Sequence, residues 1–373
     1  MKKLGFGLMR LPLTDPSDST KIDFDQMNEM VDAFLDNGFT YFDTAWMYHG
    51  EQSERAVKDA LVSRHARDSF TLTTKLPGYL LHGPEDRDRI FQEQMRRTGA
   101  GYFDYYLLHD VNSGSIDTFE KYDCFSWAQQ KKEEGLVRSV GFSFHDGPEL
   151  LDKVLSEHPE VEFVQLQLNY LDWNSLGIRS RECYETACRH GKPVFVMEPV
   201  KGGTLASVPE NVLRMFREAD PDASPASWAI RFAAGLDNVA LVLSGMSNMD
   251  QLRDNMSFMS DPKSLTEAEM DMVLRAGEMI NGTISIPCTG CSYCTVDCPA
   301  DIPIPDYFSL YNLDRQEIPS KGWTPQITYY GNLSKNRGKA SDCLRCGNCE
   351  SHCPQHLPIR DLLEKVASYF GSR

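Results

Sequence analysis

The 373-residue sequence has no long hydrophobic run. Its apolar runs, such as Val239–Leu243, are far shorter than the roughly 20 residues with which a helix crosses a bilayer. Basic residues are scarce beside acidic ones, 38 against 54, and the formal net charge is −16. An acidic balance of this size disfavours nucleic acid and anionic membrane surfaces. We therefore expect no membrane span and no nucleic-acid partner.

The beginning of the sequence also lacks the apolar core of a secretory signal peptide, because Met1-Lys2-Lys3 is followed, after Leu4, by the glycine-containing segment Gly5-Phe6-Gly7. We expect a cytoplasmic protein, in which disulfides are rare. Hydrophobic residues make up 41% of the chain and aromatic residues 10%, which excludes a disordered chain. The length exceeds one average domain, so a large domain and a smaller one are expected.

Cysteine is rare in most of the chain and dense near its end, where eight of the eleven cysteines form two copies of one pattern. The copies are Cys288, Cys291, Cys294 and Cys298 followed by Pro299, and Cys343, Cys346, Cys349 and Cys353 followed by Pro354. Zinc sites generally pair their ligands across a longer gap. The run C-x2-C-x2-C-x3-C-P is typical of iron–sulfur proteins. Two [4Fe–4S] clusters are predicted, with two zinc knuckles as the alternative.

The fourth cysteine of each run binds the other cluster in two-cluster ferredoxins. By that rule one cluster has the ligands Cys288, Cys291, Cys294 and Cys353, and the other has Cys343, Cys346, Cys349 and Cys298. The 44 residues between the two runs resemble the longer linker of helical dicluster ferredoxins. The remaining cysteines, Cys124, Cys183 and Cys188, lie in helical patterns and are expected to be buried free thiols.

Residues 1–280 alternate short apolar runs with amphipathic stretches. Strands are predicted at residues 5–9, 39–43, 70–75, 103–109, 137–143, 163–169, 193–198 and 239–244. Helices are predicted, among others, at residues 23–37, 52–64, 118–134 and 178–190. Gly38, Gly135 and Gly191 stand where helix C-terminal glycines belong, and Ser224-Pro225 is expected to begin a helix.

Eight strands that alternate with helices predict an α/β fold, a (β/α)8 TIM barrel. A doubly wound sheet is the alternative, but Gly5-Phe6-Gly7 is too short to be its Gly-rich dinucleotide turn. We expect the barrel at residues 1–280. A smaller, mainly helical, ferredoxin-like domain is expected at residues 281–373.

Four polar residues fall at or just after the ends of three consecutive predicted strands: Asp43, Tyr48, Lys75 and His109. Catalysis in TIM barrels takes place at the carboxyl ends of the strands, so these residues are expected to converge. A nearby Lys ammonium should lower the pKa of a tyrosine hydroxyl, and an Asp should hold that Lys in place. A His there can orient a carbonyl oxygen. The set suits protonation of a carbonyl oxygen while hydride reaches its carbon, or the reverse.

The residues around these four resemble a known family. The segments Tyr41-Phe42-Asp43-Thr44-Ala45-Trp46-Met47-Tyr48, Thr74-Lys75 and Leu107-Leu108-His109 resemble those of the aldo-keto reductases. The resemblance covers roughly residues 1–280. It implies that Tyr48 is the general acid/base, that Lys75 and Asp43 tune it, and that His109 orients the substrate. The cysteine-rich tail resembles that of the branch with a C-terminal dicluster ferredoxin domain.

The resemblance also implies NAD(P)H bound in an extended form. The implied cofactor-binding positions are Ser143 and Gln165 for the carboxamide, Lys201, Gly203 and Leu205 for the pyrophosphate, and Asn255 for the adenine. A plain turn is the alternative at residues 201–205. Gly245 and Gln251 stand where many members have the basic residues that bind the 2′-phosphate of NADP, so the cofactor can be either NAD or NADP. Barrel phosphate sites can also hold FMN, so a flavin is a further candidate cofactor.

The four strand-end residues and the eight motif cysteines together predict an oxidoreductase that acts on a carbonyl/alcohol pair. Two clusters would link it to a one-electron carrier such as a ferredoxin. One alternative is an ordinary NAD(P)H-dependent carbonyl reductase whose cluster domain is a structural or docking module. Another is an electron-transfer component whose barrel mainly binds a partner. The substrate is expected to be a small molecule, selected by residues near Trp46, Met47 and Tyr79.

Overall fold

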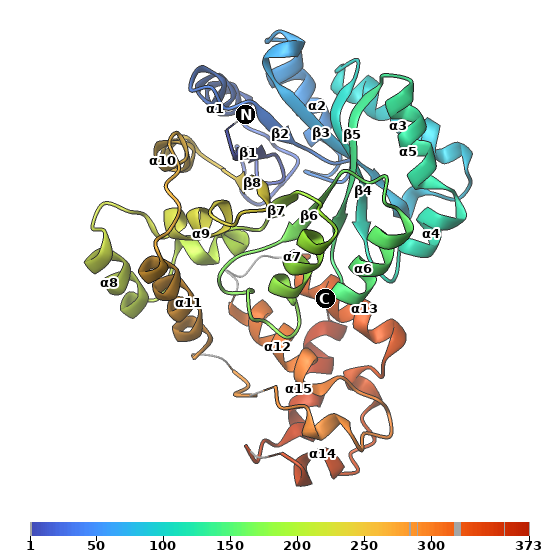
Figure 1. The fold of residues 1–373 in the computed structure, drawn as a ribbon, viewed down its shortest axis with the longest axis vertical. Helices are drawn as coiled ribbons and strands as arrows, with labels where there is room; N and C mark the ends of the chain where they lie inside the picture. Colours follow the sequence, from blue (N-terminus) through green and yellow to red (C-terminus); the bar gives the residue numbers. More distant parts are fainter. Residues whose placement is uncertain (1, 283–284, 289, 317–321, 354, 373) are drawn as a thin grey trace.

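Eight parallel strands close into a barrel in their chain order, β1 to β8, in the computed structural model (Figure 1). The structure describes residues 2–282, 285–288, 290–316, 322–353 and 355–372. The strands are β1 (Leu4–Gly7), β2 (Tyr41–Asp43), β3 (Thr71–Pro77), β4 (Phe103–Val111), β5 (Val137–Phe144), β6 (Phe163–Gln167), β7 (Val194–Met197) and β8 (Val239–Gly245). The eight predicted strands and the TIM barrel are confirmed, with strand ends that differ by at most two residues.

Helices surround the barrel. They are α1 (Phe24–Asp36), α2 (Ser53–Val57), α3 (Glu85–Thr98), α4 (Ile116–Lys121), α5 (Cys124–Glu133), α6 (Pro148–Glu157), α7 (Ser180–Arg189), α8 (Glu210–Ala219), α9 (Pro225–Ala234), α10 (Met249–Met259) and α11 (Glu267–Asn281). The helix predicted at residues 118–134 is broken in two, because Asp123 adopts a left-handed conformation with φ of 48°. The helix predicted at residues 52–64 continues beyond α2 as a wider π-helical turn.

Local signals predicted several helix ends correctly. Gly38, Gly135 and Gly191 have φ of 75°, 77° and 65°, a backbone that glycine adopts without steric cost. The Ser224 side chain caps α9 by accepting a hydrogen bond from the Ser227 amide, as expected of a Ser-Pro start. These signals fix where each helix turns back toward the next strand.

The barrel interior is filled by side chains and is not a channel. Tyr41, Leu107, Phe163, Phe195 and Leu241 are all buried there. The rings of Phe163 and Phe195 stack with their centroids 4.4 Å apart. A larger apolar core separates the strands from the surrounding helices. This packing gives the strand ends a rigid base.

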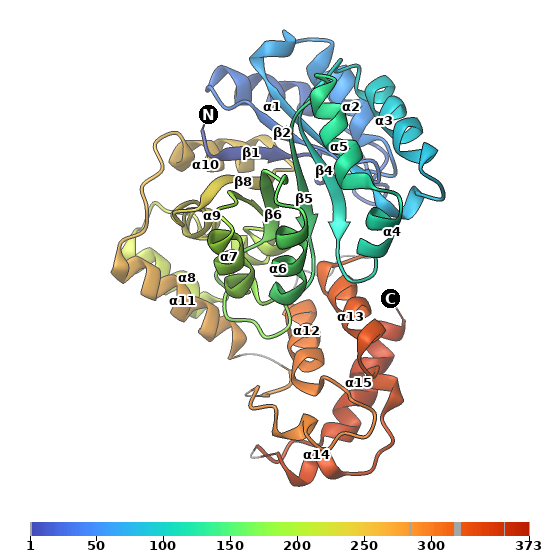
Figure 2. The ribbon, with the colours of Figure 1, turned by 45° about the vertical axis from the view of Figure 1, so that its right-hand side comes forward.

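The remaining helices form a second body at the carboxyl end of the barrel strands. They are α12 (Ile304–Gln316), α13 (Pro325–Asn336), α14 (Asn348–Ser351) and α15 (Ile359–Gly371). Figures 1 and 2 both place α12 and α13 between the barrel and α14. The two bodies touch through polar contacts as well: Asn332 Nδ2 donates to the His145 carbonyl at 3.1 Å, and the hydroxyls of Ser175 and Ser309 are 3.3 Å apart.

Within the part of the chain that the structure describes, no helix is long and apolar enough to cross a membrane. Of the three cysteines outside the motifs, Cys124 and Cys183 are buried as expected. The expectation for Cys188 is wrong: its thiol is exposed, because residue 188 lies on the outer face of α7.

Candidate active site and cysteine pockets

A cavity of about 540 Å³ opens at the carboxyl end of the barrel strands. Barrel residues that line it include Asp43, Tyr48 and His109. Trp323 and Pro325 line it from the other side and belong to the C-terminal helical body. The cavity is therefore shared by both parts of the chain.

Lys75 lies at the centre of the predicted catalytic set. It is fully buried in β3, and its Nζ donates to Asp43 Oδ1 at 2.5 Å and to the Thr44 carbonyl at 2.9 Å. The third contact of Nζ is with the Tyr48 hydroxyl, at 3.3 Å. The adjacent strands β2 and β3 bring Asp43 and Lys75 together, because Asp43 is in register with Thr73. The structure thus joins three of the four predicted residues in one hydrogen-bonded chain.

The pKa values of Lys75 and Tyr48 in this hydrogen-bonded set differ in part from the sequence-based expectation. Burial lowers the pKa of Lys75, but Asp43 and Tyr48 raise it more, so the pKa lies above its usual value and the side chain stays an ammonium. Burial raises the pKa of Tyr48. The lowering effect of Lys75 is present as expected, but burial outweighs it, so the pKa of Tyr48 lies above its usual value.

His109 faces Tyr48 across the cavity, with ring centroids 6.1 Å apart and planes nearly perpendicular at 86°. A bulge in β4 between Leu108 and Val111 turns the chain here, and Asp110 has a φ of 61°. Burial, together with the Lys75 ammonium and the neighbouring His145, holds the pKa of His109 well below its usual range. The imidazole is neutral at neutral pH and can donate one hydrogen bond into the cavity.

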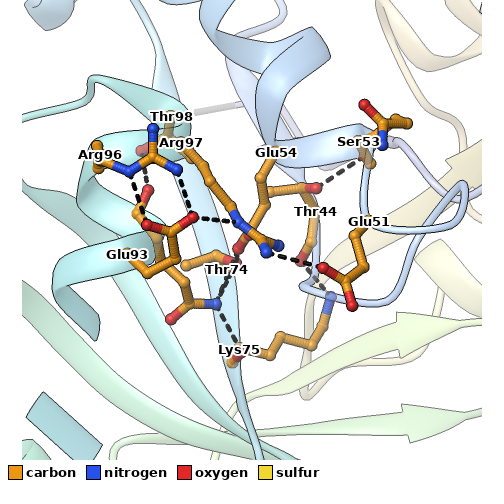
Figure 3. Close-up of polar contacts among 12 residues, drawn as sticks. Thr44, Glu51, Ser53, Glu54, Thr74, Lys75, Glu93, Arg96, Arg97 and Thr98 are labelled. Atoms are coloured by element: carbon orange, nitrogen blue, oxygen red, sulfur yellow. Dashed lines mark hydrogen bonds and ion pairs between the residues drawn. The ribbon is translucent and has the colours of Figure 1, made fainter. Parts of the chain in front are cut away.

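A buried polar network fixes the backbone at Lys75 (Figure 3). Gln94 Nε2 donates to the Lys75 carbonyl at 2.9 Å and to Glu54 Oε1 at 2.8 Å. The same Glu54 oxygen accepts from Thr74 Oγ1 at 2.7 Å, and Arg97 lies 3.5 Å from the other oxygen. These bonds hold β3 against α2 and α3, and so position the Lys75 side chain. Sequence reasoning quoted Thr74 only as part of a resemblance.

The implied cofactor positions fall into two groups. Ser143 and Gln165 line the cavity, and Gln165 Nε2 donates to Asp43 Oδ2 at 3.3 Å. A flat ring that entered this end of the cavity would meet both side chains. These two positions therefore fit the ring of a nicotinamide.

The other four implied positions are not among the residues that line the cavity: Lys201, Gly203, Leu205 and Asn255. Lys201 is fully buried and pairs with Asp172 at 2.7 Å. Asn255 is buried as well, and its Nδ2 donates to Ser244 Oγ at 2.7 Å. The structure thus gives Lys201 and Asn255 partners within the protein, which the sequence did not indicate.

The eight motif cysteines surround two small hollows in the C-terminal body. One is lined by Cys288, Cys291, Cys294 and Cys353. The other is lined by Cys298, Cys343, Cys346 and Cys349. Each hollow therefore receives three cysteines from one run and the fourth from the other run, in the crossed arrangement of two-cluster ferredoxins.

The chemistry of these quartets fits iron–sulfur clusters better than single ions. Among the described residues, no three His, Cys, Asp or Glu side chains stand close enough to hold one metal ion. A [4Fe–4S] cluster spreads its ligands around a larger body, as the cysteines around each hollow are spread. Burial and the neighbouring Cys288 raise the pKa of Cys294 to about 12, so a thiolate there needs a cation beside it.

Sequence reasoning missed several polar residues that line the cavity. They are Arg10, Asp110 and His145. Asp110 comes directly after the predicted site residue His109, and His145 lies two residues after the predicted site residue Ser143. Their position next to predicted strand ends was the one signal that could have indicated them. Met47 and Tyr79 line the cavity as expected, whereas Trp46 is buried beneath Arg97, with the guanidinium carbon 3.6 Å from its ring centroid.

The closed barrel, the cavity at its carboxyl end and the cysteine pockets define a TIM-barrel oxidoreductase with an iron–sulfur domain. The sequence pattern of the aldo/keto reductase family matches residues 3–277, and that of a 4Fe-4S dicluster domain matches residues 287–357. The chain belongs to the aldo/keto reductase family. It is an oxidoreductase of that family with a C-terminal 4Fe-4S dicluster domain, as the sequence motifs predicted.

Known relatives match the barrel. An uncharacterized oxidoreductase of Bacillus subtilis is 23% identical over 276 residues, which are 65% of this chain and 84% of the relative. An uncharacterized oxidoreductase of Schizosaccharomyces pombe is 29% identical, but the match spans 36% of this chain and about half of that protein, 46%.

Solved structures agree with this fold. The holo form of an aldo-keto reductase from Bacillus halodurans has a TM-score of 0.57 at 25% identity and covers 74% of this chain and 91% of its own. An aldo-keto reductase of Klebsiella pneumoniae in complex with NADPH has a TM-score of 0.55 at 20% identity, over 73% of this chain and 90% of its own.

Proposed function

We propose that the protein interconverts a carbonyl compound and its alcohol in the cavity, with a nicotinamide nucleotide as the hydride carrier. Two [4Fe–4S] clusters link this reaction to a one-electron carrier of the ferredoxin type. The observation that carries the proposal is the contact chain from Asp43 through Lys75 to Tyr48, whose last member opens onto the cavity. We place the protein in the cytoplasm, where its free thiols stay reduced.

The four residues divide the chemistry. His109 donates a hydrogen bond to the carbonyl oxygen and orients it toward the Tyr48 hydroxyl. Tyr48 donates its proton to that oxygen as the carbonyl carbon is reduced. Lys75 stabilises the tyrosinate that remains, and Asp43 holds the ammonium in place. In the oxidative direction Tyr48 takes the proton from the alcohol.

A nicotinamide, when bound, supplies or accepts the hydride at the carbonyl carbon. Ser143 and Gln165 would hold its carboxamide, since both side chains line the cavity beside Asp43 and Tyr48. The Klebsiella pneumoniae relative that binds NADPH supports the same class of cofactor. We assign no phosphate to Lys201, because its ammonium is buried against Asp172. FMN stays a second candidate for the link between the barrel and the clusters.

The cysteines divide into two crossed ligand sets. We assign Cys288, Cys291, Cys294 and Cys353 to one cluster, and Cys298, Cys343, Cys346 and Cys349 to the other. The two hollows support this assignment, since each is lined by one of these sets. We place the domain boundary after residue 280, in the last turn of α11, which ends at Asn281.

A second function is favoured by one observation: the C-terminal body supplies Trp323 and Pro325 to the cavity wall. A cluster domain whose role is structural would do the same, and the barrel would then be an ordinary NAD(P)H-dependent carbonyl reductase. The two functions differ in whether electrons pass between the cavity and the clusters.

The experiment that tests the site is the Tyr48→Phe variant, which removes one hydroxyl and keeps the ring. We expect a loss in turnover of roughly 10²- to 10⁴-fold, with the iron content and the folded fraction unchanged. Tyr102→Phe is the matched control, because Tyr102 does not line the cavity. Unchanged turnover in Tyr48→Phe would remove Tyr48 from the proposed chemistry.

The link to the clusters is tested by an anaerobic EPR titration with NADH and then NADPH, with dithionite as the control. Reduced-cluster signals with a pyridine nucleotide are expected from the first function. Signals with dithionite alone would favour the structural role of the domain. A flavin, if present, would show in the absorbance spectrum of the same sample.

A further inference from the structure

His145 is a buried polar side chain of the cavity that the proposed chemistry does not use. It follows the end of β5, is 7% exposed and lines the cavity. Its Nδ1 has no hydrogen-bond partner among the residues that the structure describes. Buried polar atoms in native proteins nearly always have a partner, so a missing one points to a ligand.

Three residues of the C-terminal body contact this histidine. Asn332 in α13 donates to the His145 backbone carbonyl at 3.1 Å. The ring of Tyr329 lies 6.0 Å from the imidazole centroid and that of Trp323 lies 6.5 Å from it, both edge to face. The position of His145 in the cavity is therefore set by a part of the chain nearly two hundred residues away in the sequence.

The groups around His145 favour an uncharged ligand that carries hydroxyls. Asp110 and Glu198 line the same cavity and supply carboxylate oxygens as acceptors. Burial lowers the pKa of His145 despite these two carboxylates, so the ring is neutral and offers one donor and one acceptor. Among the described lining residues Arg10 is the cation, while Lys75 is committed to Asp43. An anionic group beside His145 would be repelled by the carboxylates.

We propose that His145 is a substrate-binding residue that hydrogen-bonds a hydroxyl group of an uncharged, hydroxylated carbonyl compound. Asn332 and Trp323 of the cluster domain are the positioning residues that hold it. The proposal rests on the proposed function, because it places the carbonyl at Tyr48 and His109 and the hydroxyl at His145. The substrate class is then a hydroxyaldehyde or hydroxyketone and the corresponding polyol.

The first test compares two probes that differ in hydroxyls, D-glyceraldehyde and propanal. The wild-type holoenzyme should have the higher kcat/KM with D-glyceraldehyde, and His145→Phe should reduce this preference roughly tenfold to a hundredfold. His82→Phe is the matched control, since His82 is exposed and does not line the cavity. Equal kcat/KM values for both probes in the wild type would overturn the proposal and leave the proposed function intact.

A binding measurement keeps the proposal independent of turnover. Saturation-transfer difference NMR of the holoenzyme should detect D-threitol more strongly than 1,4-butanediol, and His145→Phe should abolish the difference. Tyr48→Phe should retain it while losing turnover. If the wild type reduces neither aldehyde but binds D-threitol through His145, the proposed function fails and the hydroxyl site stands. No D-threitol signal in the wild type overturns the site.

The role of the cluster domain is tested by Asn332→Ala, which removes one bond to the His145 backbone. We expect a higher KM for D-glyceraldehyde, an unchanged kcat, and no change for propanal. Asn336→Ala, at the exposed end of the same helix, is the control. A loss shared by both aldehydes would show that Asn332 acts on folding alone and would remove it from the proposal. The cluster absorbance confirms that each variant keeps its iron.

Discussion

At the scale of single residues, the site depends on one fully buried ammonium group. Lys75 has three oxygen partners, Asp43, Tyr48 and the Thr44 carbonyl. A buried charge is tolerated only when it is paired and hydrogen-bonded. The same contacts that make Lys75 stable in the interior place its charge next to the Tyr48 hydroxyl, which we propose as the proton donor.

The variant Lys75→Met separates these two roles. It leaves Asp43 buried without a counter-charge, and we expect it to lower the free energy of unfolding by about 3–5 kcal/mol and turnover by roughly 10²-fold or more. The double variant Asp43→Asn with Lys75→Met should recover much of the stability and none of the activity. Thermal unfolding and kcat measure the two effects. A double variant that regains turnover would contradict the role of Lys75.

The pH dependence of kcat follows from the directions in which two pKa values are shifted, those of Tyr48 and His109. The pKa of Tyr48 is raised above 10, so its protonated form persists to a higher pH than in a free tyrosine. The pKa of His109 is held well below 6.5, so its ring stays neutral through the neutral range. The kcat of carbonyl reduction should therefore be flat from about pH 6.5 to about pH 9 and fall only in more alkaline solution. A step near pH 7 or 8 would show that one of these directions is wrong.

Residues at strand ends could be predicted from the sequence, and residues placed by another domain could not. Asp43, Lys75 and His109 meet because adjacent parallel strands of a barrel end at one rim. Trp323 reaches the same rim from the C-terminal body, and nothing in its local sequence indicates this. Tyr48 was placed correctly, but its pKa depends on burial, which a single sequence does not give.

At the scale of elements, the sheet relies on one close approach of β5 and β6. A Cβ atom on Gly141 would lie 2.6 Å from the Phe163 carbonyl oxygen and 2.6 Å from its ring. Gly141 and Phe163 are in register, so neither strand can give way without disturbing the pairing that positions Ser143 and Gln165. The glycine lets two strands carry their side chains into the same end of the cavity.

Two glycine-to-alanine variants should therefore have opposite effects. Gly141→Ala should lower the free energy of unfolding by about 1–3 kcal/mol, because the added methyl meets backbone. Gly331→Ala in α13 should raise it by up to about 1 kcal/mol, since nothing lies within 4 Å of its Cβ position. Denaturant midpoints of the holoproteins measure both. Equal shifts of the two variants would show that the close approach is absent in solution.

Element boundaries show what periodicity can and cannot give. Strands were predicted within two residues because apolar runs and flanking glycines mark both ends. The helix predicted at residues 118–134 breaks at Asp123, whose left-handed backbone has no signal in the hydrophobic pattern. The two copies of the cysteine motif indicated the C-terminal domain by themselves, since their spacing is specific.

At the scale of the whole molecule, the crossed cysteine sets tie distant segments together. Cys298 lies with Cys343, Cys346 and Cys349, and Cys353 lies with the first run. A change in either fourth cysteine should therefore affect the pocket of the other run.

EPR spectra of single Cys→Ser variants test this arrangement. Cys298→Ser should perturb the same reduced-cluster signal as Cys346→Ser, and a different one from Cys291→Ser. Cys188→Ser, at an exposed thiol outside both pockets, is the control. A Cys298→Ser spectrum that matches Cys291→Ser would mean that each run binds its own cluster.

The crossing has a consequence for how the protein is made. Under the crossed assignment, the first three cysteines of the first run wait for Cys353, so neither cluster can be completed before the ribosome has produced almost all of the chain. Trp323 and Asn332 lie between the two runs in the sequence, so the segment that contributes to the cavity is flanked by ligands of both proposed clusters. If the clusters are needed to fold the C-terminal body, the barrel would fold early in synthesis and its cavity would acquire the wall formed by Trp323 and Pro325 only when iron is delivered. Iron supply would thus govern when the finished enzyme matures.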